Sequence, residues 1–275
     1  MTKIWIVGYY TFKESLARKT FIGFFAISSI VLAIFLLAMN VDVVNGALAS
    51  LSFFGKEASN VNIRVEKFVL GIEMGLATLL FTGGLFLSIF ATANLVPSML
   101  EKGNIDWVLS KPISRLQLLA GRYLGGLAIV AFNVFYLIGG AWLILSIKTG
   151  YWHFPFLISG FLVTAIFAVL FAFMVLLGVL LQNSAISIMG AYLMIFFSPM
   201  LFQREKAYAL LSKKIYQLIL DGLYYLTAHI FEAGQLMKNV ILKEPVRTWM
   251  PLWHSLVLIL FYFSIAVVFF NRKNF

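Results

Sequence analysis

The chain of 275 residues has few of the side chains on which metal sites, disulfide bonds and most catalytic centres depend. It contains no cysteine, which excludes disulfide bonds and thiolate metal sites. Only 12% of its residues are charged, and its three histidines, His153, His229 and His254, are too scattered to give metal-ligand spacing. No GxxxxGK[ST] phosphate-binding loop is present, so the chain has no means of hydrolysing a nucleotide by itself. We therefore expect no catalytic residue, no metal and no cofactor on this chain, and we do not expect it to be an enzyme.

Apolar residues, in contrast, make up 62% of the sequence, and the mean hydropathy is +0.96. A single soluble core could not bury so much apolar surface, which indicates an integral membrane protein. A helix needs about 20 apolar residues to cross the hydrocarbon layer. The sequence offers six such runs, at about 21–41, 69–96, 117–147, 155–181, 185–203 and 252–270. They predict an all-α protein with six transmembrane helices, because a membrane barrel would show much shorter alternating segments.

The first twenty residues contain too many polar positions for the apolar core of a signal peptide. Apolar residues recur there at helical spacing, opposite a basic face. The apolar positions are Ile4, Trp5, Gly8, Phe12 and Leu16, and the basic ones are Lys3, Lys13, Arg18 and Lys19. This pattern predicts an amphipathic helix lying at the membrane interface over 1–20, with a frayed polar tail as the alternative.

A polar insert at 97–116 separates the second and third apolar runs. It carries a large share of the few charges in the chain, at Glu101, Lys102, Asp106, Lys111 and Arg115. Helix breakers at Pro97, Gly103 and Pro112 predict one short helix, a turn at 110–112 and a new helix from about Ser114. A partner outside the membrane could exert a force on a short helix that is held between two spans. The alternative is that the insert is a solvated connector.

The 21 basic residues divide almost evenly between the two expected sides of the membrane. Charges next to the first span usually decide the orientation, and long loops cross largely regardless of their charge. We therefore expect a multi-pass protein of the cell (inner) membrane with the insert and both termini in the cytoplasm. If the long segment at 204–250 were cytoplasmic instead, the insert would face outward.

That segment is expected to lie outside the cell and to be helical in part. Residues 215–235 are apolar and aromatic but are interrupted by Asp221, Gly222, His229 and Glu232. A re-entrant or interfacial helix suits this composition better than a lipid-facing span. Asp221 and His229 are eight residues apart, a little over two helical turns, which is too far for direct contact.

Within the predicted spans the polar residues are almost all uncharged. Glu73 is expected near the outer end of the second span, and no carboxylate is expected in the middle of a span. Carriers driven by protons or sodium usually place carboxylates there. Gly121 and Gly125 have the GxxxG spacing that allows helices to approach closely, although glycine is common in membrane helices for other reasons too.

The insert also resembles a known family. Residues 101–125, EKGNIDWVLSKPISRLQLLAGRYLG, are similar to the cytoplasmic loop of permease subunits of ABC exporters of the second class (ABC-2 type). The matching residues are Leu109, Ser110, Lys111, Pro112, Ser114, Arg115, Gly121 and Gly125. The stretch TFKESLARK at 11–19 resembles the amphipathic entry helix of that family. Two departures are the uncharged Pro97-Ser98-Met99, where the family usually has a more charged run, and Arg122, where it usually has lysine.

The resemblance implies a permease subunit, in an exporter, that moves its substrate with ATP hydrolysed elsewhere. Its partners would be separate ATP-binding subunits that hold ATP and magnesium, a second permease copy in a homodimer or heterodimer, and membrane lipids. The cytoplasmic coupling loop at 97–116 would dock in the ATPase. Its expected docking residues are Glu101, Ile105, Asp106, Trp107, Lys111, Pro112 and Arg115, and Gly121 and Gly125 would serve helix packing.

Two other classes of protein stay open. An ion-coupled secondary carrier should show carboxylates within its spans, and a polytopic lipid-modifying enzyme should show clustered acids or histidines, for which only Asp221, His229 and Glu232 come near. The aromatic spans allow a hydrophobic or amphiphilic cargo without identifying it. Nucleic acid is not an expected partner, because the basic residues are spread over both faces.

Overall fold

The computed structural model describes residues 3–17, 19–37, 39–44, 47–53, 56–58, 64–101, 112–208, 214–246 and 248–273. Most of these residues are helical. The helices are α1 (Lys3–Leu16), α2 (Lys19–Leu37), α3 (Val65–Leu79), α4 (Leu85–Thr92), α6 (Arg115–Thr149), α7 (Pro155–Leu181), α8 (Ser184–Phe202), α9 (Arg204–Tyr208), α10 (Lys214–Leu226), α11 (Ile230–Ile241) and α12 (Met250–Arg272). A π-helical turn, Leu80–Gly84, joins α3 to α4, and a 3-10 turn, Pro97–Leu100, follows α4.

Five helical segments within these ranges are long and apolar enough to cross a membrane, counting α3 to the 3-10 turn as one segment. A sixth is added if α1 and α2, which bend by 68° where they meet, are taken together. The prediction of a helical, multi-pass membrane protein is therefore confirmed in this coarse form. Helix α7 coincides with the predicted span 155–181. The other helical segments that are long enough to cross a membrane begin and end within a few residues of the spans predicted for them.

Helix α7 forms the centre of the bundle, where it packs against α4, α6, α8, α11 and α12. It is followed almost at once by α8, because Gln182 takes a left-handed conformation (φ 52°) and the Asn183 side chain accepts hydrogen bonds from the first turn of α8. Helix α6 begins where the sequence predicts a helix start. Ser114 and Gln117 form a reciprocal capping box there.

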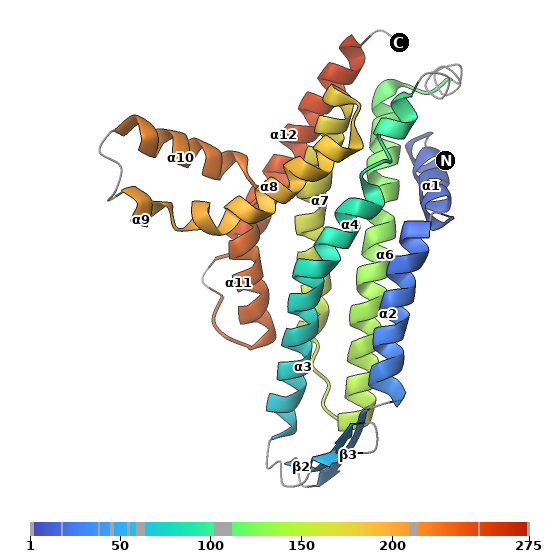
Figure 1. Ribbon diagram of the computed structural model, residues 1–275, viewed down its shortest axis with the longest axis vertical. Coiled ribbons are helices and arrows are strands. Elements are labelled where there is room, and N and C mark those ends of the chain that lie inside the picture. Colours follow the sequence, from blue (N-terminus) through green and yellow to red (C-terminus); the bar gives the residue numbers. More distant parts are fainter. Residues whose placement is uncertain are drawn as a thin grey trace.

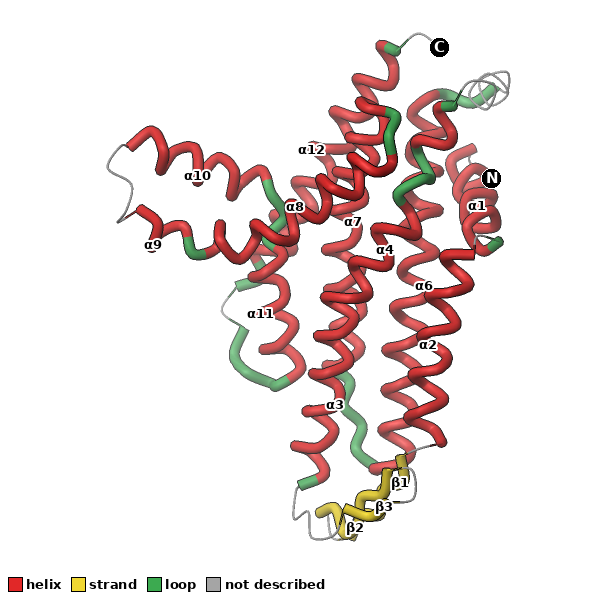
Figure 2. Tube along the Cα trace, viewed as in Figure 1, coloured by secondary structure: helices red, strands yellow, loops and turns green. Residues whose placement is uncertain are grey.

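A small three-stranded sheet departs from this otherwise helical architecture. Strands β1 (Met39–Val44), β2 (Ala47–Phe53) and β3 (Lys56–Ala58) pair antiparallel in that order. The predicted first span, 21–41, therefore stops as a helix at Leu37, and Met39 already belongs to β1. The valines of β1 favour a strand over a helix, because their branched side chains lose freedom in a helical turn. Figure 2 shows the sheet at the opposite end of the molecule from the two termini.

The expected outer segment, 204–250, contains α9, α10 and α11. The single helix expected over 215–235 is divided in two, because α10 ends at Leu226 and α11 begins at Ile230. Figure 1 shows α9 and α10 projecting sideways from the bundle as an arm. Helix α10 exposes large apolar side chains, because Leu218 is 71% exposed and Ile215 is 60% exposed.

Candidate functional site

Both termini and both sides of the insert lie at one end of the molecule (Figure 1). Of the predicted docking residues, Glu101 is exposed after the 3-10 turn, and Pro112 and Arg115 lie at the start of α6. Lys3, in the first turn of α1, donates a hydrogen bond to the Pro112 carbonyl oxygen. The other predicted docking residues fall outside the described ranges; these are Ile105, Asp106, Trp107 and Lys111.

Arg115 joins the start of α6 to the end of α12. One guanidinium nitrogen donates to the carbonyl oxygens of Phe270 at 2.6 Å and Lys273 at 2.7 Å. Lys273 in turn donates to the carbonyl oxygens of Val179 and Leu180 at the end of α7, at 2.6 and 3.1 Å. Burial lowers the pKa of Lys273. Two cations thus occupy the negative, C-terminal ends of two helix dipoles, so α6, α7 and α12 are tied together at this end.

Helix α1 packs closely on α6 through glycine positions. A Cβ atom on Gly125 would lie 2.6 Å from the Gly8 carbonyl oxygen, and one on Gly121 would lie 2.5 Å from Val7 Cβ. Both values are shorter than any ordinary contact, so only glycine allows this approach. One turn away, Arg122 forms an ion pair with Glu14 of α1 at 2.5 Å. Movement of α1 is therefore coupled to the first turns of α6, directly beyond the insert.

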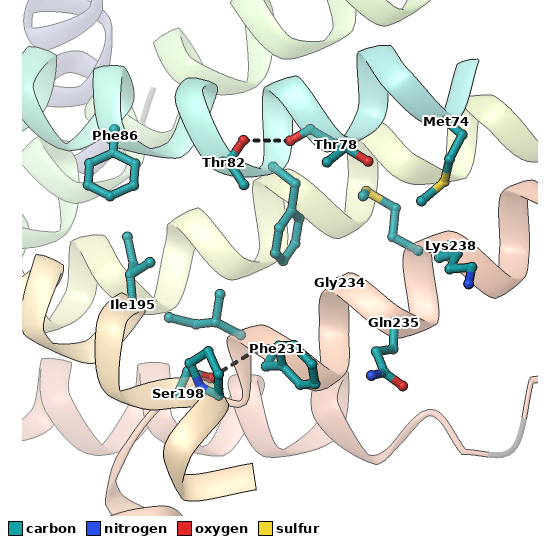
Figure 3. A pocket seen from close by; sticks show the side chains of 14 residues that line it. Met74, Thr78, Thr82, Phe86, Ile195, Ser198, Phe231, Gly234, Gln235 and Lys238 are labelled. Carbon is teal, nitrogen blue, oxygen red and sulfur yellow. Dashed lines mark hydrogen bonds between the residues drawn. The ribbon is translucent and has the colours of Figure 1, made fainter. Parts of the chain in front are cut away.

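A cavity of about 350 Å³ lies between the helical wall from α3 to α4, α8 and α11 (Figure 3). We call it the lateral groove. Its apolar wall includes Phe81 and Phe86 from the first element, Ile195 from α8 and Phe231 from α11. The groove lies beside the π-helical turn, and such turns change which side chains a helix presents to its neighbours.

Two of the polar groups that line the lateral groove form hydrogen bonds within the protein. The Thr82 hydroxyl donates to the Thr78 carbonyl oxygen at 2.8 Å, as expected for a threonine within a span. Ser198 Oγ accepts from the Phe231 backbone N–H at 3.0 Å, which satisfies a free donor in the first turn of α11. Gln235 and Lys238 of α11 are exposed and complete the lining.

A stack of four planar groups attaches the arm to the bundle. The Arg204 guanidinium lies 3.6 Å above the Tyr224 ring, Tyr224 lies 4.0 Å from His229, and His229 lies 3.9 Å from His254 of α12. The stack thus links α9, α10, the start of α11 and α12. Its partly buried members gain from cation–π and ring contacts.

Two carboxylates flank this stack. Asp221 accepts from Arg204 Nε at 2.9 Å and from the Tyr208 hydroxyl, and these hydrogen bonds lower the pKa of Asp221. Burial opposes ionisation of Glu232, but the neighbouring His229 and the Tyr224 hydroxyl outweigh it and lower the pKa of Glu232. Arg204 and Tyr224 lie between Asp221 and His229, and Glu232 also links Tyr224 to His229.

Glu73 and His153 form a buried pair that the sequence did not reveal. Their oxygen and nitrogen lie 2.5 Å apart, and each side chain is 1% exposed. Glu73 lies on α3, and His153 lies in the short connection between α6 and α7. Burial lowers the pKa of His153. Both residues were visible in the sequence, but nothing in their separation of eighty positions indicated that they would meet.

Within the described ranges, no group of three or more histidine, aspartate or glutamate side chains could hold a metal ion. The chain matches no family model and no curated protein sequence. The sequence did not predict the lateral groove either, because its walls come from segments about 150 residues apart, such as Phe81 and Phe231. The described structure is that of a polytopic helical membrane protein with a groove open at its side.

Proposed function

We propose that the chain is the membrane-spanning permease subunit of an ATP-driven exporter in the cell (inner) membrane, with both termini in the cytoplasm. The observation that carries the proposal is the placement of the residues that flank the insert. Glu101 follows one long apolar segment and Pro112 precedes the next, at the end of the molecule where α1, α6 and α12 are joined by Lys3 and Arg115. A force applied to the insert would therefore reach several helices at once.

In this proposal the energy comes from a separate ATP-binding subunit, which holds ATP and magnesium. The docking residues are those at the insert, from Glu101 to Arg115, with Trp107 as the apolar anchor and Asp106 and Lys111 as charges at the rim. A second permease copy completes the transport path. The lateral groove would form the part of that path contributed by this chain, because it is concave, mainly apolar and open.

The first experiment asks whether an ATP-binding subunit associates with the full chain. Co-expression of the chain with the ATP-binding protein encoded nearest to it, followed by purification of the chain, should recover both proteins in a defined ratio. Trp107→Ala, which removes the anchor, should reduce the recovered ATPase about tenfold or more. Trp152→Ala is the matched control, since Trp152 is 51% exposed beyond the end of α6 distant from the insert. Equal recovery with both variants would contradict the docking role of the insert.

Arg115 is less suitable for this test, because its guanidinium holds the end of α12. A change there would alter the bundle as well as the docking surface. Asp106→Asn provides a second variant within the insert, and it changes a rim charge without removing an apolar side chain. We expect it to weaken association less than Trp107→Ala.

An ion-coupled carrier is the second candidate, and the buried Glu73–His153 pair favours it. A carboxylate and an imidazole 2.5 Å apart in a buried site can hold a proton between them. In such a carrier, transport would follow a proton gradient, Glu73→Gln would abolish it, and no ATP-binding subunit would be needed. Transport that persists in vesicles without ATP, and that is lost in Glu73→Gln, would favour this second function over the first.

A further inference from the structure

The lateral groove has its apolar and polar groups at different places along its length. Figure 3 shows Phe86 and Ile195 at one end and Met74 and Lys238 at the other. Among the described residues that line the groove, Lys238 alone carries a charge. A bound molecule would therefore meet hydrocarbon over most of its length and a cation at one end.

The other polar groups of the lining, which are the hydroxyls of Thr78, Thr82 and Ser198 and the Gln235 amide, are uncharged and do not reverse this polarity. The Thr82 hydroxyl donates to the Thr78 carbonyl oxygen, and Ser198 Oγ accepts a hydrogen bond from the Phe231 N–H. The exposed Gln235 amide and the Lys238 amino group are left at the Lys238 end. In the part of the chain that the structure describes, no carboxylate forms an ion pair with Lys238.

We propose that the lateral groove binds an anionic amphiphile, with its carboxylate or phosphate on Lys238 and its hydrocarbon chain against Phe81, Phe86 and Ile195. The inference names the substrate class of the proposed exporter and rests on that function. A peptide segment fits less well, because its backbone N–H and C=O groups would lie against the apolar wall without partners. A cationic amphiphile would be repelled at the polar end, where Lys238 stands.

On one side of the groove, the Phe81 ring lies close against Gly234 of α11. A Cβ atom on Gly234 would lie 3.1 Å from Phe81 Cε1, so glycine allows the Phe81 ring to lie against α11. Met74 and Met237 line the groove as well, and their flexible side chains adapt to hydrocarbon of different lengths. The head group, held by an amine, would therefore contribute more to selectivity than the chain.

Photolabelling of the purified full chain in neutral phosphatidylcholine nanodiscs tests the proposal. The probes are a long-chain fatty acid that carries a photoreactive group in its chain, at a pH where the acid is ionised, and the methyl ester of the same acid. Labelling of Phe81 and Phe231 is measured by mass spectrometry and divided by labelling at Leu260, which is 70% exposed on α12. We expect the acid to label the groove about tenfold more than the ester, as for one added charge-assisted hydrogen bond.

Variants then test the role of the charge. Lys238→Gln should bring the ratio of acid to ester close to one while ester labelling of the groove persists, and Lys238→Arg should retain the preference. Lys214→Gln, which removes an exposed charge from α10, is the matched control and should leave the ratio unchanged. Because Lys238 is exposed, high salt should reduce the preference.

Equal labelling by acid and ester in the natural sequence would overturn the proposal, and so would a preference that survives Lys238→Gln. Neither result depends on an ATPase. Failure of the chain to associate with an ATP-binding subunit would instead overturn the proposed exporter, even if the preference for the acid were found. The two failures are therefore distinguishable.

Discussion

Helices α7 and α8 are neighbours in sequence and both are strongly apolar, yet their surroundings are opposite. In the most apolar 18-residue window of α7, 78% of the residues are buried, against 28% in α8. Helix α7 is largely buried among five other helices, whereas α8 leaves apolar side chains such as Phe196 (68%) and Met189 (62%) exposed, and the α9–α10 arm projects from the bundle (Figure 1). This difference shows that the hydropathy of a helix identifies it as a membrane helix but does not reveal where in the bundle the helix lies. The packed side holds the fold together, and the open side retains apolar surface for lipid or for another subunit.

The largest expected effect comes from replacing one phenylalanine on the packed side and one on the open side. Phe171 of α7 is 1% exposed, lies against Gly126 and stacks on Tyr123 at 5.5 Å. Phe171→Ala should lower the free energy of unfolding by about 3–5 kcal/mol, because it leaves a cavity in the centre of the bundle. Phe196 of α8 is 68% exposed, and Phe196→Ala should change the same quantity by less than about 0.5 kcal/mol. Equal losses in reversible unfolding in mixed micelles would contradict the comparison.

Replacing one glycine on each side by alanine gives the next largest effects on stability, and the two effects have opposite signs. Gly125→Ala places a methyl group 2.6 Å from the Gly8 carbonyl oxygen and should destabilise the protein by about 1–3 kcal/mol. Gly222→Ala on α10 meets no atom within 4 Å and should stabilise that helix by up to about 1 kcal/mol through better helix propensity.

Amide hydrogen exchange separates these two glycine effects, because exchange should rise in α1 for Gly125→Ala and fall in α10 for Gly222→Ala. Unchanged exchange in α1 would mean that α1 does not rely on the close contact with α6.

The smallest effect concerns the contact between α9 and α10 within the arm and depends on pH. Hydrogen bonds from Tyr208 and Arg204 lower the pKa of Asp221 below its usual value of 3.8. This contact is therefore fully present above that value and is lost as the pH falls through the lowered, folded-state pKa. Asp221→Asn should loosen α9 from α10 at neutral pH and remove this acid dependence.

Spin labels can follow this change, because the natural chain has no cysteine and two can be introduced without interference. Labels at Lys206→Cys and Leu218→Cys should show a narrow distance distribution at neutral pH and a broad one in strong acid. Glu205→Gln, at an exposed position of α9, is the control and should keep the narrow distribution at neutral pH. A narrow distribution in Asp221→Asn at neutral pH would show that the ion pair does not hold α9 against α10.

Several features of the fold could be predicted from the sequence because they depend on local patterns. Long apolar runs predict the helices of the bundle, and the helix breaker Pro112 predicts the start of α6 near Ser114. The sheet that begins at Met39 could not be predicted from this pattern, because Met39 and Val41 extend the apolar run past Leu37 with Asn40 between them, which predicts a span that reaches residue 41. The division between α10 and α11 was missed because no proline or glycine marks it at 227–229.

The candidate site was less predictable, because its parts meet only in three dimensions. Thr78 and Thr82 were visible as polar residues of a span, but nothing in the sequence placed Lys238 opposite them. The pairing of Glu73 with His153 and the stacking of Arg204, Tyr224, His229 and His254 also join distant segments. The predicted docking residues of the insert remain a prediction, because their role depends on a second protein.

The π-helical turn at Leu80–Gly84 contains one residue more than an α-helical turn would need. If that residue were taken up into regular helix, every side chain beyond it would swing by about 100° around the helix axis. Phe86 would then face a different neighbour while Met74 kept its place. A single backbone adjustment at this turn would thus exchange one wall of the groove for another, without any helix leaving its position in the bundle.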